Sequence, residues 1–547
     1  MRPASWRSEY VLVGVMAMGC GSANDQAPPT VAAPRLVAPL STATATSQQP
    51  TLHWALAEGT DGAQIEICRD RACATQIASF AADGSSGTPT ASLPAGVLFW
   101  HAFGRGAGVV GKVPSPTWEL TVGTRSAAFD SSSGTIADVN GDGRADLLVG
   151  AMGGAYLYLG NEAGVTSSPD AALTDPGTGA PLASAGDVNG DGYPDILIGA
   201  PGPSPGSSRV HLYVGGPSGL ASSPAISLAP PPDPTPSLGE TELFGIAVSS
   251  AGDVNGDGYA DVLVGEPEID SATGKAHLYL GGPSGLAAAP DLTLVGPDGA
   301  NGAFGHSVAG AGDVNGDGYA DILVAAVRYA SQTGRVYLYL GGPTGPAAQP
   351  DVELTGPDGT GGYFGRPAIG VGDVNGDGYA DVLITAYGID SYTGRAYLYL
   401  GGPTGLATEP AVVLAGPDGA GGNFGYAVAG AGDVDGDGYV DVVVGAEGVD
   451  GNTGRVYLYL GSPAGLAATP AVTVSGAVAA GHFGRAIAAA GDVDGDGHAD
   501  VVVGADFVDS MAGRAYLLLG RGTGLAPTAD VTLSDPQSVG TFGVSVL

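Results

Sequence analysis

A nine-residue stretch rich in aspartate and glycine occurs seven times in this chain. Three copies, which begin at Asp253, Asp313 and Asp373, read DVNGDGYAD, and the other four differ at one or two positions. Each copy offers side-chain oxygens at positions 1, 3, 5 and 9, and its glycine at position 6 permits a sharp turn. Position 7 can add a backbone carbonyl, which gives the spacing of the first half of an EF-hand loop. Because Val149 stands at the twelfth position of the first copy, the ninth-position aspartate must supply the closing ligand.

An all-oxygen, carboxylate-rich cage suits calcium better than magnesium, which needs stricter geometry, or zinc, which prefers His and Cys. Asp, Asn and Gly also make good hairpin turns, but turn formation explains one copy and not the same acidic positions in seven. The stretches therefore predict up to seven Ca²⁺ ions. The predicted ligands, with Arg, Tyr and His contributing backbone carbonyls, are Asp138, Asn140, Asp142, Arg144, Asp146, Asp187, Asn189, Asp191, Tyr193, Asp195, Asp253, Asn255, Asp257, Tyr259, Asp261, Asp313, Asn315, Asp317, Tyr319, Asp321, Asp373, Asn375, Asp377, Tyr379, Asp381, Asp433, Asp435, Asp437, Tyr439, Asp441, Asp492, Asp494, Asp496, His498 and Asp500.

The acidic stretches recur about every 60 residues between residues 123 and 547, which indicates a tandem array. In the repeat that starts at Phe424, strands are predicted over residues 424–432, 441–448, 456–461 and 471–476. Four antiparallel strands repeated seven times predict a seven-bladed β-propeller, with a solenoid as the alternative. The chain is thus expected to be all-β.

A Phe-Gly pair precedes the acidic stretch by nine residues in the five later repeats, whereas the first repeat has Phe129-Asp130. The chain then ends in TFGVSVL, where Phe542 opens a further strand with no acidic stretch after it. We expect this terminal strand to pair into the first repeat and close the ring.

The array resembles the FG-GAP repeat family, found in the N-terminal propeller of integrin α subunits and in bacterial surface proteins. The resemblance rests on Phe244-Gly245, Asp253–Asp261 and Gly265-Glu266-Pro267, and on the literal Gly199-Ala200-Pro201. It implies a seven-bladed propeller with calcium in the hairpins that join first and second strands. All seven repeats here keep the acidic stretch and no leg domains follow, so a partnership with a β subunit is not implied.

The N-terminus has the order of an export signal. Residues 1–20 contain two arginines and then a short apolar stretch, and the end at Cys20 resembles a bacterial lipobox. This implies a signal peptide, lipidation of Cys20 and an outer-membrane or cell-surface lipoprotein. The alternative is cleavage after Ala23 and secretion as a soluble protein. Residues 21–33 are predicted to be a flexible linker.

Residues 34–122 contain about seven short β segments, which favours a β-sandwich that loosely resembles a fibronectin type III or immunoglobulin-like module. Trp54, Trp100 and Trp118 are its expected core anchors. Cys68 and Cys73 are a plausible local disulfide in an oxidising compartment.

The charge balance limits the partners. The chain has 19 basic and 55 acidic residues and a net charge of −36, so it lacks the basic footprint of a nucleic-acid binder. No later stretch is apolar enough for a membrane helix, which leaves a lipid anchor as the only expected membrane contact. A protein or glycan ligand is expected on the face opposite the acidic stretches, where the turns between second and third strands vary in sequence.

Two features of those turns have ordinary explanations. A basic residue recurs after six of these turns, and in four repeats an aspartate five residues earlier is placed to form an ion pair with it. The pairs expected are Lys275 with Asp270, Arg395 with Asp390, Arg455 with Asp450, and Arg514 with Asp509. Tyrosines at 329, 363, 387 and 392 could stack on sugar rings or simply anchor the loops.

No catalytic constellation stands out. His211, His277 and His498 occupy positions that hold tyrosine in other repeats, and nucleophile-elbow and zinc-protease motifs are missing from the sequence. We therefore expect a calcium-binding adhesion or ligand-binding module and not an enzyme. The alternatives are an envelope scaffold and, less favoured, a propeller that accompanies a hydrolase or lyase.

Overall fold

The computed structural model describes residues 31–41, 43–45, 47–123, 137–178, 181–202, 206–232, 243–537 and 540–547. The predicted signal and lipidation site at Cys20, the cleavage site after Ala23, most of the 21–33 linker and Phe129 lie outside these residues. Among the helices of the described residues, none is both long and apolar enough to cross a membrane.

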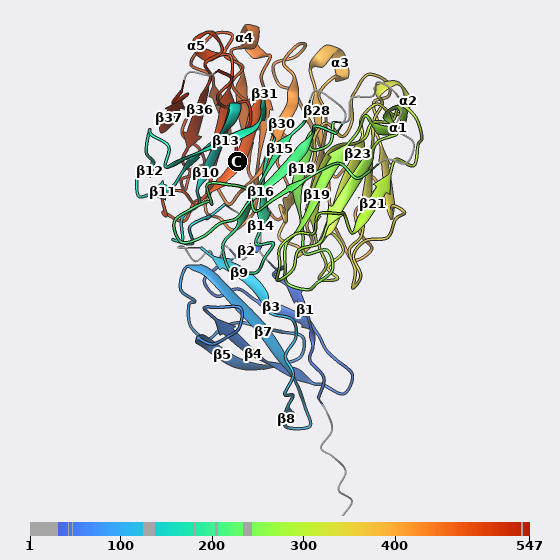
Figure 1. Cartoon of the computed structure of the whole chain (residues 1–547), viewed down its shortest axis with the longest axis vertical. Coiled ribbons are helices and arrows are strands. Elements are labelled where there is room, and N and C mark those ends of the chain that lie inside the picture. Colours follow the sequence, from blue (N-terminus) through green and yellow to red (C-terminus); the bar gives the residue numbers. More distant parts are fainter. Residues whose placement is uncertain are drawn as a thin grey trace, which may run out of the picture.

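Residues 31–123 form two β-sheets, which we call the N-terminal unit (Figure 1). One sheet has the order β1-β3-β6 and the other β2-β9-β7-β4-β5, with β8 beside β7. The strands are β1 (Arg35–Ala38), β2 (Ala43–Ala45), β3 (Leu52–Ala55), β4 (Gly62–Cys68), β5 (Gln76–Asp83), β6 (Ser86–Gly87), β7 (Gly96–Gly106), β8 (Val109–Val110) and β9 (Trp118–Val122). There are nine strands and not about seven, partly because β6 and β8 are only two residues long. Trp54, Trp100 and Trp118 are at most 2% exposed, which confirms them as core anchors.

Six four-stranded antiparallel sheets follow along the chain, each built from consecutive strands. Their strands are β14 (Leu182–Gly186), β15 (Asp195–Ala200), β16 (Arg209–Tyr213) and β17 (Ile226–Leu228); β18 (Ala247–Gly252), β19 (Asp261–Glu266), β20 (Lys275–Tyr279) and β21 (Leu292–Val295); β22 (Phe304–Gly312), β23 (Asp321–Ala326), β24 (Arg335–Tyr339) and β25 (Val352–Thr355); β26 (Ala368–Gly372), β27 (Asp381–Ala386), β28 (Arg395–Tyr399) and β29 (Val412–Ala415); β30 (Phe424–Gly432), β31 (Asp441–Ala446), β32 (Arg455–Tyr459) and β33 (Val472–Ser475); β34 (Ala486–Gly491), β35 (Asp500–Ala505), β36 (Arg514–Leu518) and β37 (Val531–Ser534). The four strands predicted for the repeat at Phe424 are confirmed as β30 to β33.

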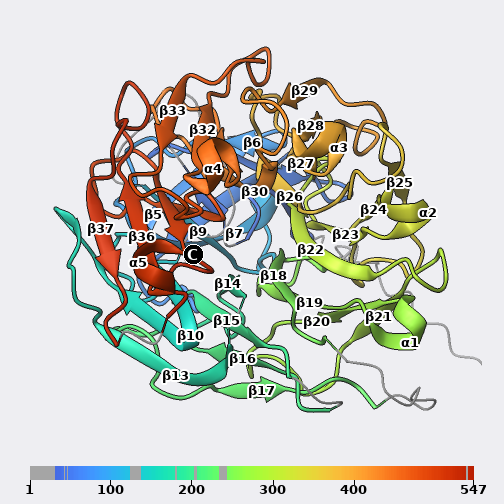
Figure 2. The same cartoon turned by 90° about the horizontal axis from the view of Figure 1, so that it is seen from above.

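The sheets stand around a common axis, as Figure 2 shows from above. Their cores lie between neighbouring sheets: one cluster joins Leu398 and Leu414 of one sheet to Val442, Val444 and Tyr457 of the next. The second strand of each sheet is buried along its whole length because it is covered on both sides. Each sheet therefore relies on its neighbours for burial.

The first sheet of the ring contains both ends of the array. β10 (Leu147–Tyr158) pairs with β13 (Ala171–Thr178), and β11 (Gly160–Asn161) with β12 (Gly164–Val165). On its other side β10 accepts the chain end: Leu148 and Leu547 exchange backbone hydrogen bonds of 2.9 Å, and the Gly150 N–H donates to the Ser545 carbonyl at 2.9 Å. The predicted closure by the terminal strand is confirmed, and the solenoid alternative is wrong because the two ends meet.

The ring has two distinct faces. One carries five four-residue turns that follow the second strands, seen at the top of Figure 1. They are α1 (Ile269–Ala272), α2 (Tyr329–Gln332), α3 (Ile389–Tyr392), α4 (Val449–Asn452) and α5 (Val508–Met511). We call this side the turn face. The acidic stretches lie on the other side, the loop face, next to the N-terminal unit.

All four ion pairs expected on the turn face are present. Lys275 lies 2.8 Å from Asp270, and the Arg–Asp distances in the other three pairs are 2.6 Å. The central residues of these turns have left-handed backbone angles, as at Asp270 (φ 55°) and Ser271 (φ 59°), so each turn reverses sharply and brings the partners together.

Candidate metal centre

Each acidic stretch forms a compact loop; loops 2 to 7 lie between the first and second strands of their sheets, and loop 1 leads directly into β10. Loops 1 to 7 begin at Asp138, Asp187, Asp253, Asp313, Asp373, Asp433 and Asp492. In loop 3 the Asp253 carboxylate accepts the N–H groups of Gly256 (2.7 Å), Asp257 (3.1 Å) and Gly258 (2.7 Å). The Asn255 side-chain oxygen accepts the Asp257 N–H at 2.9 Å. The side chains thus fold the loop around themselves and turn their oxygens inward.

The ninth-position aspartate ties each loop to its sheet. In loop 3 the two oxygens of Asp261 accept the N–H groups of Val254 (2.9 Å) and Gly281 (2.8 Å). A carboxylate has about four acceptor sites, so two remain for a cation. The same aspartate can therefore clamp the third strand and close a metal site, although its clamping role was not predicted from the sequence.

Burial disfavours the ionised form of these carboxylates in the metal-free chain. Burial and the neighbouring Asp257 carboxylate raise the pKa of Asp253 to about 7, against hydrogen bonds that lower it. Burial, with the nearby Asp435 carboxylate, raises the pKa of Asp441 to about 8. The same causes raise the pKa of Asp195 and Asp500 to about 8. A divalent cation would offset this repulsion.

The geometry is most favourable in loops 6 and 7, where aspartate replaces asparagine at position 3. Ligand oxygens of Asp433, Asp435 and Asp441 lie within 4.8 Å of one another, as do those of Asp492, Asp494 and Asp500. The Asp433 Oδ1 atom is buried and has no hydrogen-bond partner. An unsatisfied buried carboxylate oxygen inside an all-oxygen cluster fits a hard divalent cation.

The loops are joined to one another around the ring. In five of the seven junctions the N–H at position 8 donates to the position-1 carbonyl of the preceding loop at 2.9–3.0 Å. These bonds run from Ala145 to Asp492, Ala260 to Asp187, Ala320 to Asp253, Ala380 to Asp313 and Ala499 to Asp433. Pro194 occupies position 8 of loop 2 and has no N–H to donate. The bond from Ala145 to Asp492 links loop 1 to loop 7, so these bonds join loops 2, 3, 4 and 5 in one run and loops 6, 7 and 1 in another.

The side chains at position 7 have a role that the sequence analysis missed, since only their carbonyls were considered. A Cβ added to the position-4 glycines Gly141, Gly190, Gly256 and Gly316 would lie 2.5–2.8 Å from the tyrosine ring of the next loop. Each of these tyrosine rings therefore packs directly on the position-4 glycine of the preceding loop. The signal was visible as tyrosine at the same loop position in five copies.

The N-terminal unit covers part of the loop face. Arg71 donates hydrogen bonds to the carbonyls of Gly190 (3.2 Å) and Gly258 (2.8 Å), in loops 2 and 3. Arg35 donates to the Asp317 carbonyl in loop 4. Near the ring axis a cavity of about 220 Å³ is lined by loop residues Asp138, Asp433 and Asp492 and by strands β2 and β9. These contacts were not predicted.

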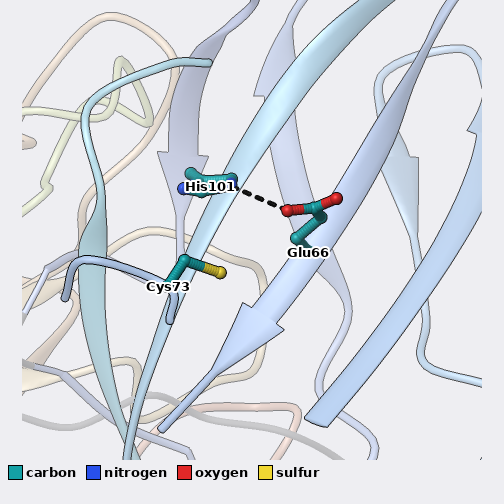
Figure 3. Close-up of side chains that lie close together, drawn as sticks. All are labelled: Glu66, Cys73 and His101. Atoms are coloured by element: carbon teal, nitrogen blue, oxygen red, sulfur yellow. Dashed lines mark hydrogen bonds and ion pairs between the residues drawn. The ribbon is translucent and has the colours of Figure 1, made fainter. Parts of the chain in front are cut away.

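Two side-chain clusters outside the loops also bring histidine close to glutamate. Glu66, Cys73 and His101 offer ligand atoms within 4.8 Å of one another (Figure 3). The Cys73 sulfur, however, is bonded to Cys68 in a disulfide, so it is not a thiolate ligand. On the ring, His277 lies 3.0 Å from both Glu266 and Thr293 and is 1% exposed, a buried hydrogen-bonded position.

Comparisons with known proteins agree with the repeats. The model of the FG-GAP-like repeat matches residues 138–198, 253–324, 313–384, 373–444 and 433–503, more than half of the chain. Integrin alpha-IIb of Mus musculus is 41% identical over 175 residues, which cover 30% of this chain and 16% of that protein. Integrin alpha-V of Gallus gallus is 32% identical over 216 residues, 37% of this chain and 20% of that protein.

The chain thus matches only about a fifth or less of the length of these integrin relatives. A crystal structure of a protein from Lactobacillus plantarum superposes with a TM-score of 0.42 and 13% identity, over 73% of this chain and 98% of that one. Because the family model covers most of the ring, with its Phe-Gly pairs and acidic loops, this chain belongs to the FG-GAP-like repeat family.

Proposed function

We propose that the protein is an extracytoplasmic, calcium-binding module whose seven-bladed propeller binds a protein or glycan ligand on its turn face. The observation that carries the proposal is that the two faces differ in what they contact and in what they expose. The loop face holds the acidic loops and contacts the N-terminal unit. The turn face instead exposes large side chains, among them Tyr392 (47%), Phe507 (38%) and Met511 (49%).

Exposed aromatic and methionine side chains on a rigid scaffold are typical of recognition surfaces. Tyr387 stands at the centre of an aromatic group: its ring lies 5.5 Å from Tyr363, 6.1 Å from Tyr392 and 5.4 Å from Tyr426. The Arg366 guanidinium lies 5.7 Å from the Tyr387 ring. Calcium, on the opposite face, stiffens the ring and takes no part in chemistry.

The orientation of the chain supports a surface role. Ala32 and Val31 pack against β7 and the segment after β8, since a Cβ at Gly104 would lie 1.9 Å from the Ala32 carbonyl. In Figure 1 this end of the N-terminal unit points away from the ring. A lipid anchor at Cys20 would therefore hold the turn face outward from the membrane.

Ligand binding is tested by immobilising the calcium-loaded protein and probing it with envelope extract and a glycan array, with an EDTA-treated sample beside it. We expect a partner that binds in calcium and is lost from the triple variant Tyr392→Ala, Phe507→Ala, Met511→Ala. The matched control is Val413→Ala, which removes a side chain of similar exposure from the outermost strand β29. Its binding should be unchanged.

No partner with a folded ring, together with concentration-dependent assembly in light scattering, would contradict the binding function and favour an envelope scaffold. Turnover of a polysaccharide or phosphodiester would contradict the expectation that the protein is not an enzyme.

Calcium binding itself is tested by charge removal in loop 6. The substitution Asp435→Asn deletes one carboxylate from a site that has four, and should weaken one calcium site about tenfold, because ligand charge tunes calcium affinity. Isothermal titration calorimetry measures this as one weakened site among seven. The matched control, Asp450→Asn, removes the same charge from the turn face and should leave every site unchanged; equal calorimetric curves for both variants would contradict calcium binding in loop 6.

A further inference from the structure

The disulfide between Cys68 and Cys73 closes a short loop that carries Arg71 toward the ring. We propose that this loop, residues 68–73, is a latch that docks the N-terminal unit on the loop face. Arg71 is its specificity-determining residue, and the disulfide holds the loop in the shape that docks. The partner surface consists of the backbone carbonyls of loops 2 and 3. This inference goes beyond the proposed function, because it concerns contacts within the chain and does not depend on what the turn face binds.

The latch has one well-defined shape. The Cys73 N–H donates to the Asp70 carbonyl at 2.8 Å, and the Asp70 carboxylate accepts the N–H groups of Ala74 (2.8 Å) and Thr75 (2.9 Å). The disulfide ties the two ends of this turn, with Cα atoms 5.1 Å apart. A loop that is held in its bound shape loses less conformational freedom on docking, so the disulfide favours the docked state.

Arg71 recognises two neighbouring loops at once. Its Nε donates to the Gly190 carbonyl in loop 2, and its Nη1 donates to Gly258 in loop 3 and to Thr117 of the N-terminal unit, at 3.2, 2.8 and 3.1 Å. Its guanidinium also lies 4.6 Å from the Tyr259 ring. A planar fork of fixed donors suits this double contact, whereas the single ammonium of lysine does not.

Buried charge adds to the dependence on Arg71. Its Nη2 lies 3.6 Å from both Glu119 of β9 and Asp187 of loop 2, which are 2% and 0% exposed. Without the guanidinium, the buried Glu119 would lose the cation that faces it, even with a calcium ion held by Asp187 in loop 2, and that loss is unfavourable.

The surface around Arg71 is close-fitting. Ser41 Oγ donates to the Gly258 carbonyl at 3.1 Å, and a Cβ at Gly258 would lie 2.4 Å from the Thr117 carbonyl. His101 of β7 forms a 3.3 Å hydrogen bond with Glu66 of β4, drawn in Figure 3, and another of 3.3 Å with Thr117, which itself accepts a hydrogen bond from Arg71. The position-6 glycine of loop 3 therefore serves docking as well as the turn.

The test uses the whole purified protein in calcium and compares it with Arg71→Ala and with the double variant Cys68→Ser, Cys73→Ser. Small-angle X-ray scattering measures whether the N-terminal unit stays on the ring. Hydrogen exchange is followed in residues 117–121 and 256–259, which face each other across the interface. The matched control is Arg69→Ala, an exposed arginine of the same disulfide loop.

We expect Arg71→Ala to increase the radius of gyration and to speed exchange at the interface about 100-fold, because it removes the hydrogen bonds to loops 2 and 3 and the cation that faces the buried Glu119. The double cysteine variant, and reduction of the native protein, should act in the same direction, and Arg69→Ala should do neither. Emission of the buried Trp54, Trp100 and Trp118 reports whether the N-terminal unit stays folded. Unchanged scattering and exchange in Arg71→Ala would overturn the latch, and a docked, folded double cysteine variant would overturn the role of the disulfide.

Discussion

Removal of calcium with EDTA lowers the unfolding temperature of the ring by more than about 10 °C. At a calcium concentration 100 times the dissociation constant, each filled site stabilises the folded state by about 2.7 kcal/mol. Five of the seven loop junctions carry a backbone hydrogen bond such as that from Ala145 to Asp492, so loss of several ions weakens loops that are bonded to one another. Differential scanning calorimetry in calcium and in EDTA measures the shift.

The size of the calcium effect should depend on pH. In the metal-free chain the pKa of Asp146 and Asp441 is raised to about 8, and that of Asp381 to about 7, first of all by burial. These pKa values lie above the unfolded value near 4, so the protonated carboxyls favour the fold. Their contribution is complete below about pH 4 and is lost as the pH rises through 7 to 8. Without calcium the unfolding temperature should therefore fall from pH 5 to pH 8.

Calcium binding needs the deprotonated carboxylates, so its affinity rises over the same range. The gap between the calcium and EDTA unfolding temperatures should therefore be widest at pH 8. Sodium chloride at matched ionic strength is the control, because simple screening also weakens repulsion between carboxylates. An EDTA sample that melts at the calcium temperature at pH 8 would show that the loops are structural turns and not cation sites.

Deletion of residues 540–547 also lowers the unfolding temperature by more than about 10 °C. The segment supplies five backbone hydrogen bonds to the first sheet: Met152 to Gly540, Gly543 to Gly150, Gly150 to Ser545, and the pair between Leu148 and Leu547. It also supplies Phe542, which is fully buried and whose ring lies 5.8 Å from Tyr156. Loss of the segment leaves β10 as an open edge, which invites pairing between molecules.

A single substitution distinguishes the loss of buried side-chain packing from the exposure of the β10 edge. Phe542→Ala keeps the strand but removes a buried ring, and should cost about 3–5 kcal/mol. Gln537→Ala, an exposed residue just before the segment, should change the unfolding free energy by less than about 0.5 kcal/mol. Chemical denaturation measures both. A truncated protein that melts at the parent temperature and stays monomeric would contradict closure by the terminal strand.

The sequence was enough to predict the repeat architecture. Alternating apolar residues in VYLYLG and the Phe-Gly pairs mark strands, and the regular spacing of the acidic stretches places them in equivalent sheets. The terminal strand could be predicted because Phe542 stands where each repeat begins, with no repeat after it. The ion pairs on the turn face, such as Arg455 with Asp450, follow from a separation of five residues across a tight turn. All of these are local or periodic features, and periodicity in sequence becomes symmetry in space.

Contacts between non-equivalent parts of the chain could not be predicted in this way. Arg71 is separated by 119 residues from Gly190 and by 187 from Gly258, and neither glycine differs in sequence from its counterparts in other loops. Glu119 appears as one polar residue in a strand until the fold places it beside Asp187. The sequence likewise marks the ninth-position aspartates only as metal ligands, and their second role, accepting backbone N–H groups such as those of Val254 and Gly281, appears only in the structure.

By itself, then, the sequence determined the number and order of the acidic loops, the strands that carry them and the strand that closes the ring, because each depends on short-range pattern repeated along the chain. Only the tertiary structure decided that five of the seven loop junctions carry a backbone hydrogen bond, that Asp433 keeps a buried oxygen unsatisfied and that the disulfide loop reaches loops 2 and 3. Those features depend on how distant segments approach one another. That approach is set by the packing of whole sheets, which no local pattern records.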